Sequence, residues 1–292
     1  MPTYPLTAIN VGSFALGEAD KVITLFSKER GIVKAVAKGA RKPGAKFSGK
    51  SELLCVNKLL LAKGKSLDII TQAESLETFS ALRVDLERLT FGLYFAELTR
   101  AFSTALEEDC AFFYELLFAF LARLTQPDSI PGLLAMEFEL ALLQLLGLRP
   151  QLEVCILCRQ PLTEYSISVF VKDMGGICCQ SCADRHGRRG PNYGQIREYG
   201  PRPERSLTLD QEGEDYPLSG TYITPLVWKL LVLACARADR VLAEGGFPEA
   251  ERAKKPSEIQ KSALKAARKI LERYLEDKAG KRMKSLDLLE SL

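Results

Sequence analysis

The chain has 292 residues, of which 47% are hydrophobic and 26% charged, so it can bury one large core or two to three small ones. No stretch approaches the roughly 18 uncharged apolar residues of a membrane helix, and the first residues show neither the charged flank nor the apolar run of a signal peptide. We therefore expect a globular protein of the cytoplasm with no membrane partner.

The net charge of +3 conceals an uneven distribution along the chain. Residues 1–80 carry 12 Lys and Arg against 7 Asp and Glu, and residues 221–292 carry 15 against 10, a net +5 in each segment. Residues 81–150 carry 5 against 10, and residues 151–220 carry 8 against 10. This asymmetry favours a polyanion-binding surface at one or both ends of the chain, with an acidic or neutral body between them.

Five short strands are predicted in the first eighty residues, where runs of apolar and β-branched residues alternate with turn residues. The second and third strands are joined by residues 27–31, in which Gly31 can supply the positive φ of a tight hairpin connection. A small closed β-barrel is the economical packing for five such strands. The predicted strands cover residues 6–16, 22–26, 32–37, 53–61 and 67–73.

The segment 38–50 lies between the third and fourth predicted strands and is rich in Lys, Arg, Gly and Pro. It has no apolar period, and Phe47 is its only large apolar residue. We expect a mobile basic loop.

From Leu76 the apolar residues recur at three- to five-residue steps, which predicts that a helical region begins there. The last predicted helix opens on the capping-box pattern Ser257-Glu-Ile-Gln260. Residues 187–220 are rich in Gly, Pro and Arg and are expected to be irregular. The further predicted helices cover residues 110–124, 133–148, 225–243 and 257–277.

Five of the eight cysteines fall between Cys155 and Cys182, and four of them form two CxxC pairs separated by twenty residues. Each pair presents two sulfurs from one tight turn, and the intervening residues can form a short hairpin that returns the chain, as in four-thiolate zinc sites. Because four sulfurs leave no open position for water, we expect one structural zinc rather than a catalytic one. The predicted ligands are Cys155, Cys158, Cys179 and Cys182.

Two alternatives to this ligand set remain open. Cys178 adjoins the second pair, although the spacing to Cys182 favours Cys179, and a site of three cysteines with His186 is conceivable. The other cysteines lie in apolar runs and are expected to be buried, inert thiols. A redox role would require only one CxxC pair and leaves the second unexplained.

Catalytic motifs are missing from the sequence. The single histidine, His186, stands in a basic run, and the chain has neither a GxxxxGK(S/T) phosphate loop nor a GxGxxG after a predicted strand. A nuclease would need clustered carboxylates, which are sparse among the first eighty residues. These observations favour a binding protein over an enzyme.

Residues 28–65 contain 11 Lys and Arg against only Glu29 and Glu52. On a five-stranded barrel such a stripe can track a phosphate backbone, and Phe26 or Phe47 could offer a stacking face to an unpaired base. The alternative is that the lysines are ordinary solvated residues and the two aromatic residues are core. The predicted DNA contacts are Lys28, Arg30, Lys34, Lys38, Arg41, Lys42 and Lys46.

The basic helix near the C-terminus is a weaker candidate for DNA binding, because its cations alternate with Glu272, Glu276 and Asp277.

Several segments along the whole chain resemble the RecO family of bacterial recombination mediators. The resemblance is most specific in the first block, where a Gly-Glu-Ala-Asp-Lys turn leads into a basic hairpin. The matching segments are Gly17–Lys21, Thr24–Gly31, Ala35–Arg41, Thr71–Glu74, the four-cysteine element with Gly175-Gly176 before its second pair, Arg273–Glu276 and Lys284–Asp287.

The resemblance implies an α+β chain: a five-stranded OB-fold that binds DNA at residues 1–80, and an α-helical domain at residues 81–292 with a zinc element inserted at residues 151–190. It also implies a non-enzymatic mediator of homologous recombination and DNA repair. Such a protein binds single- and double-stranded DNA, anneals complementary strands at the nucleoid, and with its partner RecR helps to load RecA onto SSB-coated strands. Some members of the family lack the cysteines, so zinc there looks like a folding device.

The C-terminal tail of SSB is a further implied partner, expected on the helical part of the chain. Trp228 is a candidate for the tail pocket, although a lone tryptophan at helical spacing is more often a core residue.

Two functions from other classes compete with DNA annealing. An RNA-binding OB and zinc module of translation or RNA metabolism would prefer RNA to DNA of equal sequence. A metal-dependent nuclease would shorten its substrate in Mg²⁺ or Mn²⁺.

Overall fold

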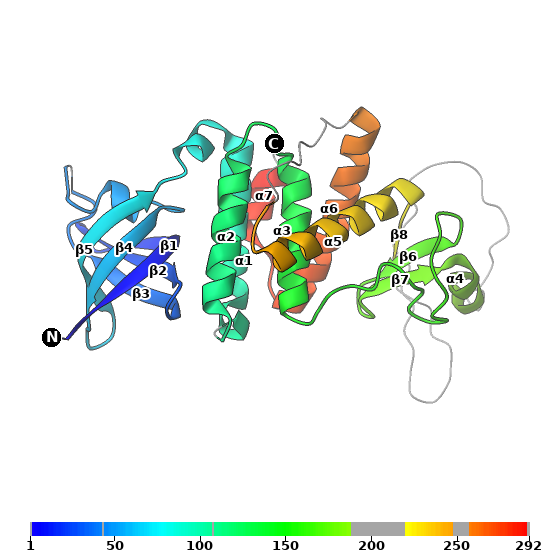
Figure 1. The fold of residues 1–292 in the computed structure, drawn as a ribbon, viewed down its shortest axis with the longest axis horizontal. Helices are drawn as coiled ribbons and strands as arrows, with labels where there is room; N and C mark the ends of the chain where they lie inside the picture. The colour runs from blue at the N-terminus through cyan, green and yellow to red at the C-terminus, as the bar shows by residue number, and fades with distance from the viewer. Residues whose placement is uncertain (1, 43, 107, 188–219, 248–256, 291–292) are drawn as a thin grey trace. The chain divides into compact units, whose positions relative to one another are not determined.

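The computed structural model describes residues 2–42, 44–106, 108–187, 220–247 and 257–290. These residues form two compact units, the first made of residues 1–138, 239–255 and 279–292 and the second of residues 139–238 and 256–278. Each unit is discontinuous in sequence, because the helical segments near the C-terminus divide between them. Figure 1 labels the elements in chain order.

The first unit opens with a closed barrel whose strand order is β1-β2-β3-β5-β4. Neighbouring strands are antiparallel except β3 and β5, which are parallel. This order is that of an OB-fold, so the predicted five-stranded barrel is confirmed (Figure 1). Its strands are β1 (Thr3–Leu16), β2 (Asp20–Ser27), β3 (Gly31–Ala37), β4 (Val56–Ala62) and β5 (Asp68–Glu77).

The ends of β4 and β5 differ from the predicted ends. Leu54 has a φ of +66° and hydrogen bonds to Asn10, so the chain is not extended until Val56. β5 continues to Glu77, and the prediction of a helical region from Leu76 was wrong. The apolar residues that follow Leu76 recur with a helical spacing, but Leu76 itself is an exposed residue near the end of β5.

The basic segment after β3 is a succession of hydrogen-bonded turns rather than a loop without structure. Backbone N–H groups at Lys42, Ala45 and Ser48 each bond a carbonyl three residues earlier, at 3.0–3.2 Å. The 3-10 helix η1 (Gly49–Ser51) completes the segment before β4. The predicted basic loop is therefore built from turns and one short 3-10 helix.

The helices of the first unit enclose an aromatic core. The ring of Phe138 lies 4.5 Å from Phe95, 5.2 Å from Phe120 and 5.9 Å from Phe113, measured between ring centroids. Phe113 also meets Phe26 of the barrel edge-on at 5.6 Å, so the helices pack against the outer face of the barrel, whose interior forms a core of its own. The main helices are α1 (Leu86–Phe102), α2 (Cys110–Leu124), the first half of α3 (Pro131–Leu145) and α7 (Lys284–Glu290).

Two helix starts in this unit have local causes. Asp85 accepts a hydrogen bond from the Arg88 N–H at 3.0 Å and caps α1. Glu97 of α1 accepts bonds from the Lys284 and Ser285 N–H groups at 3.0 and 2.8 Å, and so caps α7 from a distant part of the chain. Because this cap is not local, α7 was not predicted.

The second unit holds a small sheet in the order β7-β6-β8 and the remaining helices. Ser257 and Gln260 form the predicted capping box, with hydrogen bonds of 2.8 and 3.3 Å. The predicted irregular stretch falls mainly on residues 188–219, outside the described residues. The elements are β6 (Ile167–Val171), β7 (Gly176–Cys179), α4 (Gln180–Gly187), β8 (Thr221–Tyr222), α5 (Pro225–Glu244) and α6 (Glu258–Ala279), of which α5 and α6 end in the first unit.

Within the described ranges, no helix has the length and apolar character that a membrane span requires.

Candidate metal centre and nucleic-acid interface

The first pair of cysteines sits in a tight turn of the second unit. Val154 and Pro161 form an isolated antiparallel bridge that closes the loop between them. The Arg159 N–H donates to the Cys155 carbonyl at 3.0 Å, and Arg159 has a φ of +61°, so the chain reverses directly after Cys158. Both sulfurs therefore point to the same side of the turn.

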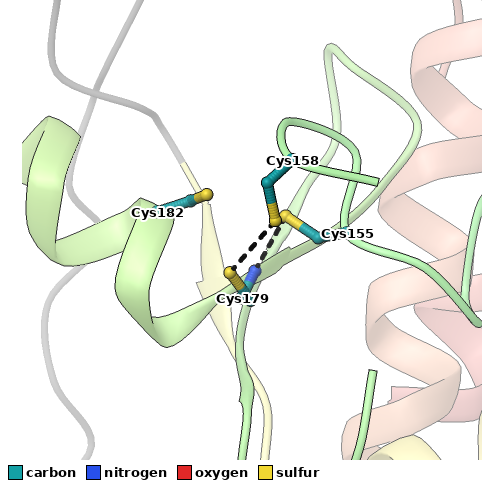
Figure 2. A group of neighbouring side chains, drawn as sticks. All are labelled: Cys155, Cys158, Cys179 and Cys182. Carbon is teal, nitrogen blue, oxygen red and sulfur yellow. Dashed lines mark hydrogen bonds between the residues drawn. The ribbon is translucent and has the colours of Figure 1, made fainter. Parts of the chain in front are cut away.

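The second pair is placed by a strand that runs into a helix. Cys179 is the last residue of β7, and Cys182 lies in the first turn of α4. The antiparallel partner of β7 is β6, so residues between the two pairs form a hairpin that returns the chain, as the spacing predicted. Figure 2 shows the four side chains converging from these two turns.

The four sulfur atoms lie within 4.8 Å of one another. The Sγ atoms of Cys158 and Cys179 are 3.8 Å apart. A tetrahedral zinc ion with Zn–S bonds of about 2.3 Å places its sulfur ligands roughly 3.8 Å apart, so the cluster fits such an ion. These residues can hold a metal ion.

The electrostatics of the cluster also suit a cation. Burial opposes ionisation of the Cys155 thiol, but the backbone N–H groups of Cys158, Cys179 and Leu157 lower its pKa to about 6. Burial, followed by hydrogen bonds within the cluster, raises the pKa of Cys182 to about 12. One thiolate forms readily, and its negative charge opposes ionisation of the other three thiols. Four thiolates can therefore exist together only if a bound cation neutralises part of their charge.

Cys178 and His186 are not in the cluster. Successive residues of a strand point to opposite faces, and the Cys178 thiol is buried and bonds the Cys179 carbonyl at 3.5 Å. Burial, and then repulsion from Cys155, raise the pKa of Cys178, which keeps this thiol neutral. His186 lies on α4, and the group of close ligand atoms among the described residues contains only cysteines.

Close packing holds the element to the helices of its own unit. A Cβ at Gly176 would lie 2.7 Å from the Gln151 carbonyl oxygen, and one at Gly175 would lie 2.8 Å from the Tyr274 hydroxyl. Only glycine fits at either position, which explains the Gly-Gly pair before the second knuckle. The Nε1–H of Trp228 donates to the Leu152 carbonyl at 2.8 Å, so this tryptophan anchors the segment that leads to the first knuckle.

The remaining thiols, Cys55, Cys110 and Cys235, are buried and lie outside the cluster, as expected.

The seven basic residues predicted to contact DNA are all exposed, but they do not line one open groove. Phe26 on the outer face of the β2–β3 hairpin is fully buried, because it packs against Phe113 of α2. Lys28 and Arg30 occupy the turn between β2 and β3, and Lys34 lies on β3. The other four follow the far end of β3, and we call them the loop cations: Lys38, Arg41, Lys42 and Lys46.

The two residues of the β2–β3 turn already have partners. Lys28 Nζ lies 2.5 Å from a Glu115 carboxylate oxygen, and this hydrogen bond raises the pKa of Lys28. The Arg30 guanidinium stacks 4.2 Å from the centroid of the Tyr4 ring. The Tyr4 hydroxyl donates to Asp68, and burial together with this bond raises the pKa of Tyr4 to about 12.

The loop cations, by contrast, form no ion pair with any carboxylate in the described part of the chain. The turn that carries them is held by its backbone: the Arg41 N–H donates to the Ala19 carbonyl at 3.0 Å, and the Arg41 side chain donates to the Gly17 carbonyl at 2.6 Å. Arg41 is therefore held in place, and none of the four charges has a carboxylate partner among the described residues.

Of the two candidate stacking residues, one is a core residue and the other is half-buried. Phe26 is fully buried against Phe113, so its proposed role as a stacking face was wrong. Phe47 is half-buried and packs against the hydrophobic core of the barrel. An exposed aromatic side chain lies elsewhere, at Phe14 near the tip of the β1–β2 hairpin. It was missed in the sequence analysis because Phe14 stands in an apolar run, which predicts a strand residue that faces the core.

Comparison with known proteins assigns most of this chain. The model described as "Recombination protein O N terminal" matches residues 1–79, and that described as "Recombination protein O C terminal" matches residues 83–196. Three similar proteins are each called DNA repair protein RecO. That of Gloeobacter violaceus is 39% identical over 193 residues, covering 64% of this chain and 71% of the relative. That of a Nostoc species is 36% identical over 194 residues, covering 61% and 64%. That of Symbiobacterium thermophilum is 35% identical over 185 residues, covering 63% and 73%.

The OB-type barrel, the helical region and the two matched models together place the chain in a class of recombination proteins that begin with such a barrel. Both family models match in the expected order, and the relatives agree with them. The chain belongs to the RecO family of DNA repair proteins. The resemblance found in the sequence is therefore confirmed.

Proposed function

We propose that this protein is a non-enzymatic recombination mediator that binds single- and double-stranded DNA and anneals complementary strands. In this proposal it works at the nucleoid with RecR and helps to load RecA onto SSB-coated single strands. The observation that carries the proposal is the group of loop cations on the barrel of a RecO-family chain, exposed and with no ion pair to any carboxylate that the structure describes. Residues 1–80 would then be the DNA-binding domain and residues 81–292 the helical domain, with the cysteine element at 151–190.

Annealing requires no chemical step. The protein must lower the repulsion between two phosphate backbones for long enough that base pairs nucleate, and clustered Lys and Arg do this by replacing condensed counterions. Arg41 and Lys42 are adjacent in sequence and exposed, so they can contact neighbouring phosphates. Lys34 would add a further contact, and Lys28 and Arg30 would contribute less, because these two turn residues already have partners. Phosphate contacts carry no sequence information, so binding should tolerate any sequence and fall steeply with salt.

We further propose that the four cysteines hold one structural zinc ion. When bound, the ion would supply a cross-link between the two turns of this small element. Cys155 and Cys158 come from one turn, and Cys179 and Cys182 from the junction of β7 and α4, so the metal ties two otherwise separate turns together. All four ligands come from the protein, which leaves no position for a reacting water and supports a role other than catalysis.

The acidic tail of SSB would bind the helical part, on or beside α6. Lys261, Lys265 and Lys269 recur every four residues on this helix and are exposed, so they form one basic face that suits a carboxylate-rich peptide. Trp228 is less suited to a tail pocket, because it is half-buried and its N–H is already bonded to Leu152. Charge reversal at Lys265 and Lys269 should weaken binding of a tail peptide and leave single-strand binding within about twofold.

The direct test of the proposal is strand annealing. Purified protein mixed with SSB-coated complementary strands should speed duplex formation without shortening either strand in Mg²⁺ or Mn²⁺. It should bind DNA at least as well as RNA of equal sequence. Preference for RNA, or metal-dependent shortening of the strands, would contradict the proposal and favour the RNA-binding or nuclease alternative.

A further inference from the structure

The tip of the β1–β2 hairpin is an exposed apolar surface. Residues 13–18 are all exposed, and the side chains of Phe14 and Leu16 are 55% and 41% accessible. Residues two apart in a strand share a face, so both side chains lie on one side of the hairpin. Phe14 pairs with Val22, which is fully buried, so the aromatic ring lies at the border between the core and solvent.

The turn that carries the loop cations is bonded directly to this tip. Arg41 donates from its backbone N–H to Ala19 and from its side chain to Gly17, at 3.0 and 2.6 Å. The Gly39 N–H donates to the Asp20 carboxylate at 2.7 Å. Gly17 has a φ of +61°, which permits the tight turn that presents its carbonyl to the guanidinium. Three hydrogen bonds therefore fix the basic turn beside the apolar tip.

The charges around Phe14 are predominantly positive. Lys38, Arg41 and Lys42 are exposed and form no ion pair with a carboxylate in the residues that the structure describes. Of the two acidic residues at the tip, Asp20 is already bonded by Gly39, and Glu18 is exposed. An aromatic face beside clustered cations is the combination with which single-strand-binding proteins hold bases and phosphates at once.

We propose that Phe14, with Leu16 beside it, forms a stacking face for an unpaired DNA base while Arg41 and Lys42 contact the phosphates next to that base. The inference rests on the proposed DNA-binding function and adds a basis for distinguishing single strands from duplexes. In a duplex the faces of the bases are stacked on one another and are not accessible, whereas in a single strand they can meet an exposed ring. Any base has such a face, so the contact is independent of sequence.

The test uses the full-length protein with two ligands of equal length: oligothymidine, and a strand of abasic deoxyribose phosphates. Phe14→Ala should weaken binding of oligothymidine by about tenfold, because one base–aromatic stack is worth about 1–3 kcal/mol. Binding of the abasic strand should stay within about twofold. Phe14→Tyr retains an aromatic face and should bind both ligands as the parent does. Tyr165→Ala, at an aromatic residue that is 89% exposed in the second unit, is the matched control and should change neither.

A second readout reports stacking itself. A strand with 2-aminopurine at one position should lose fluorescence when the parent binds, and much less when Phe14→Ala binds at saturation. Equal weakening of both ligands by Phe14→Ala would show a structural rather than a stacking role and would overturn the inference. Unchanged binding of oligothymidine by Phe14→Ala would also overturn it while leaving the proposed function intact. A parent protein that binds no single strands would refute the proposed function itself.

Discussion

The cysteine element and the basic surface of the barrel are positioned by different means. In the element, the four ligands come from two short turns, and the spacing of each pair brings its two sulfurs together. On the barrel, the cations near β3 are distributed by long-range packing, which leaves the loop cations open and gives Lys28 a carboxylate partner 87 residues away. Local spacing therefore brings the four cysteines together, whereas the tertiary fold decides which basic residues have a carboxylate partner among the described residues.

The largest expected effect comes from removing one ligand of the metal site. Cys179→Ser should abolish stoichiometric metal binding and make the protein poorly soluble, because three thiolates hold zinc weakly and the two turns of the element then lose their cross-link. Elemental analysis of protein purified under reducing conditions without chelator should fall from about one zinc per chain to nearly none.

Cys178→Ser is the matched control, because its side chain is buried beside the site but points away from it. It should keep both zinc and solubility. If Cys178→Ser lost zinc while Cys179→Ser kept it, the ligand assignment would be reversed.

The next effect tests the barrel core against the stacking hypothesis. Phe26→Ala should lower the free energy of unfolding by about 3–5 kcal/mol, because it removes a fully buried ring that contacts Phe113. Urea denaturation of the parent and the variant measures the difference. Single-strand affinity of the folded variant should be unchanged. If the variant were as stable as the parent but defective in single-strand binding, Phe26 would belong to the DNA interface rather than to the core.

The smallest effect concerns the engaged cation of the β2–β3 turn. Glu115→Gln removes the carboxylate that faces Lys28, so it should strengthen single-strand binding by about two- to threefold at low salt. Glu74→Gln, at an exposed carboxylate on β5, serves as the control for loss of one negative charge. Titration of labelled oligonucleotide compares the three proteins. If both variants gained the same affinity for single strands, the effect would come from net charge rather than from release of Lys28.

The contrast between the two regions also explains what the sequence could predict. The clustering of the four cysteines and the return hairpin follow from residue spacing alone, and the capping box at Ser257 and Gln260 is equally local. The strand order of the barrel follows from the resemblance to the family. The cysteine cluster, the hairpin and the capping box depend on short segments whose chemistry is visible in the sequence, whereas the strand order does not.

Other features depend on distant contacts and could not be predicted. Phe26 and Phe14 stand in similar apolar runs, yet α2 covers one and leaves the other exposed. The start of α7 depends on Glu97, nearly two hundred residues earlier. The strand that continues past Leu76 has an apolar spacing that also suits a helix. In each case the residue type is known from the sequence, but the residues that it contacts in the folded chain are not.

The central claim is that the loop cations carry DNA binding, and a paired charge reversal tests it most directly. Arg41→Glu with Lys42→Glu should weaken single-strand binding by roughly an order of magnitude or more at low salt and flatten its salt dependence, because two phosphate contacts are lost and two carboxylates repel the backbone. Lys265→Glu with Lys269→Glu, on the exposed face of α6, is the matched reversal and should leave binding nearly unchanged. Both proteins should keep their zinc and their melting temperature. If the α6 reversal abolished binding and annealing while the Arg41 and Lys42 reversal left them intact, the DNA site would lie on the C-terminal helix and the account would be contradicted.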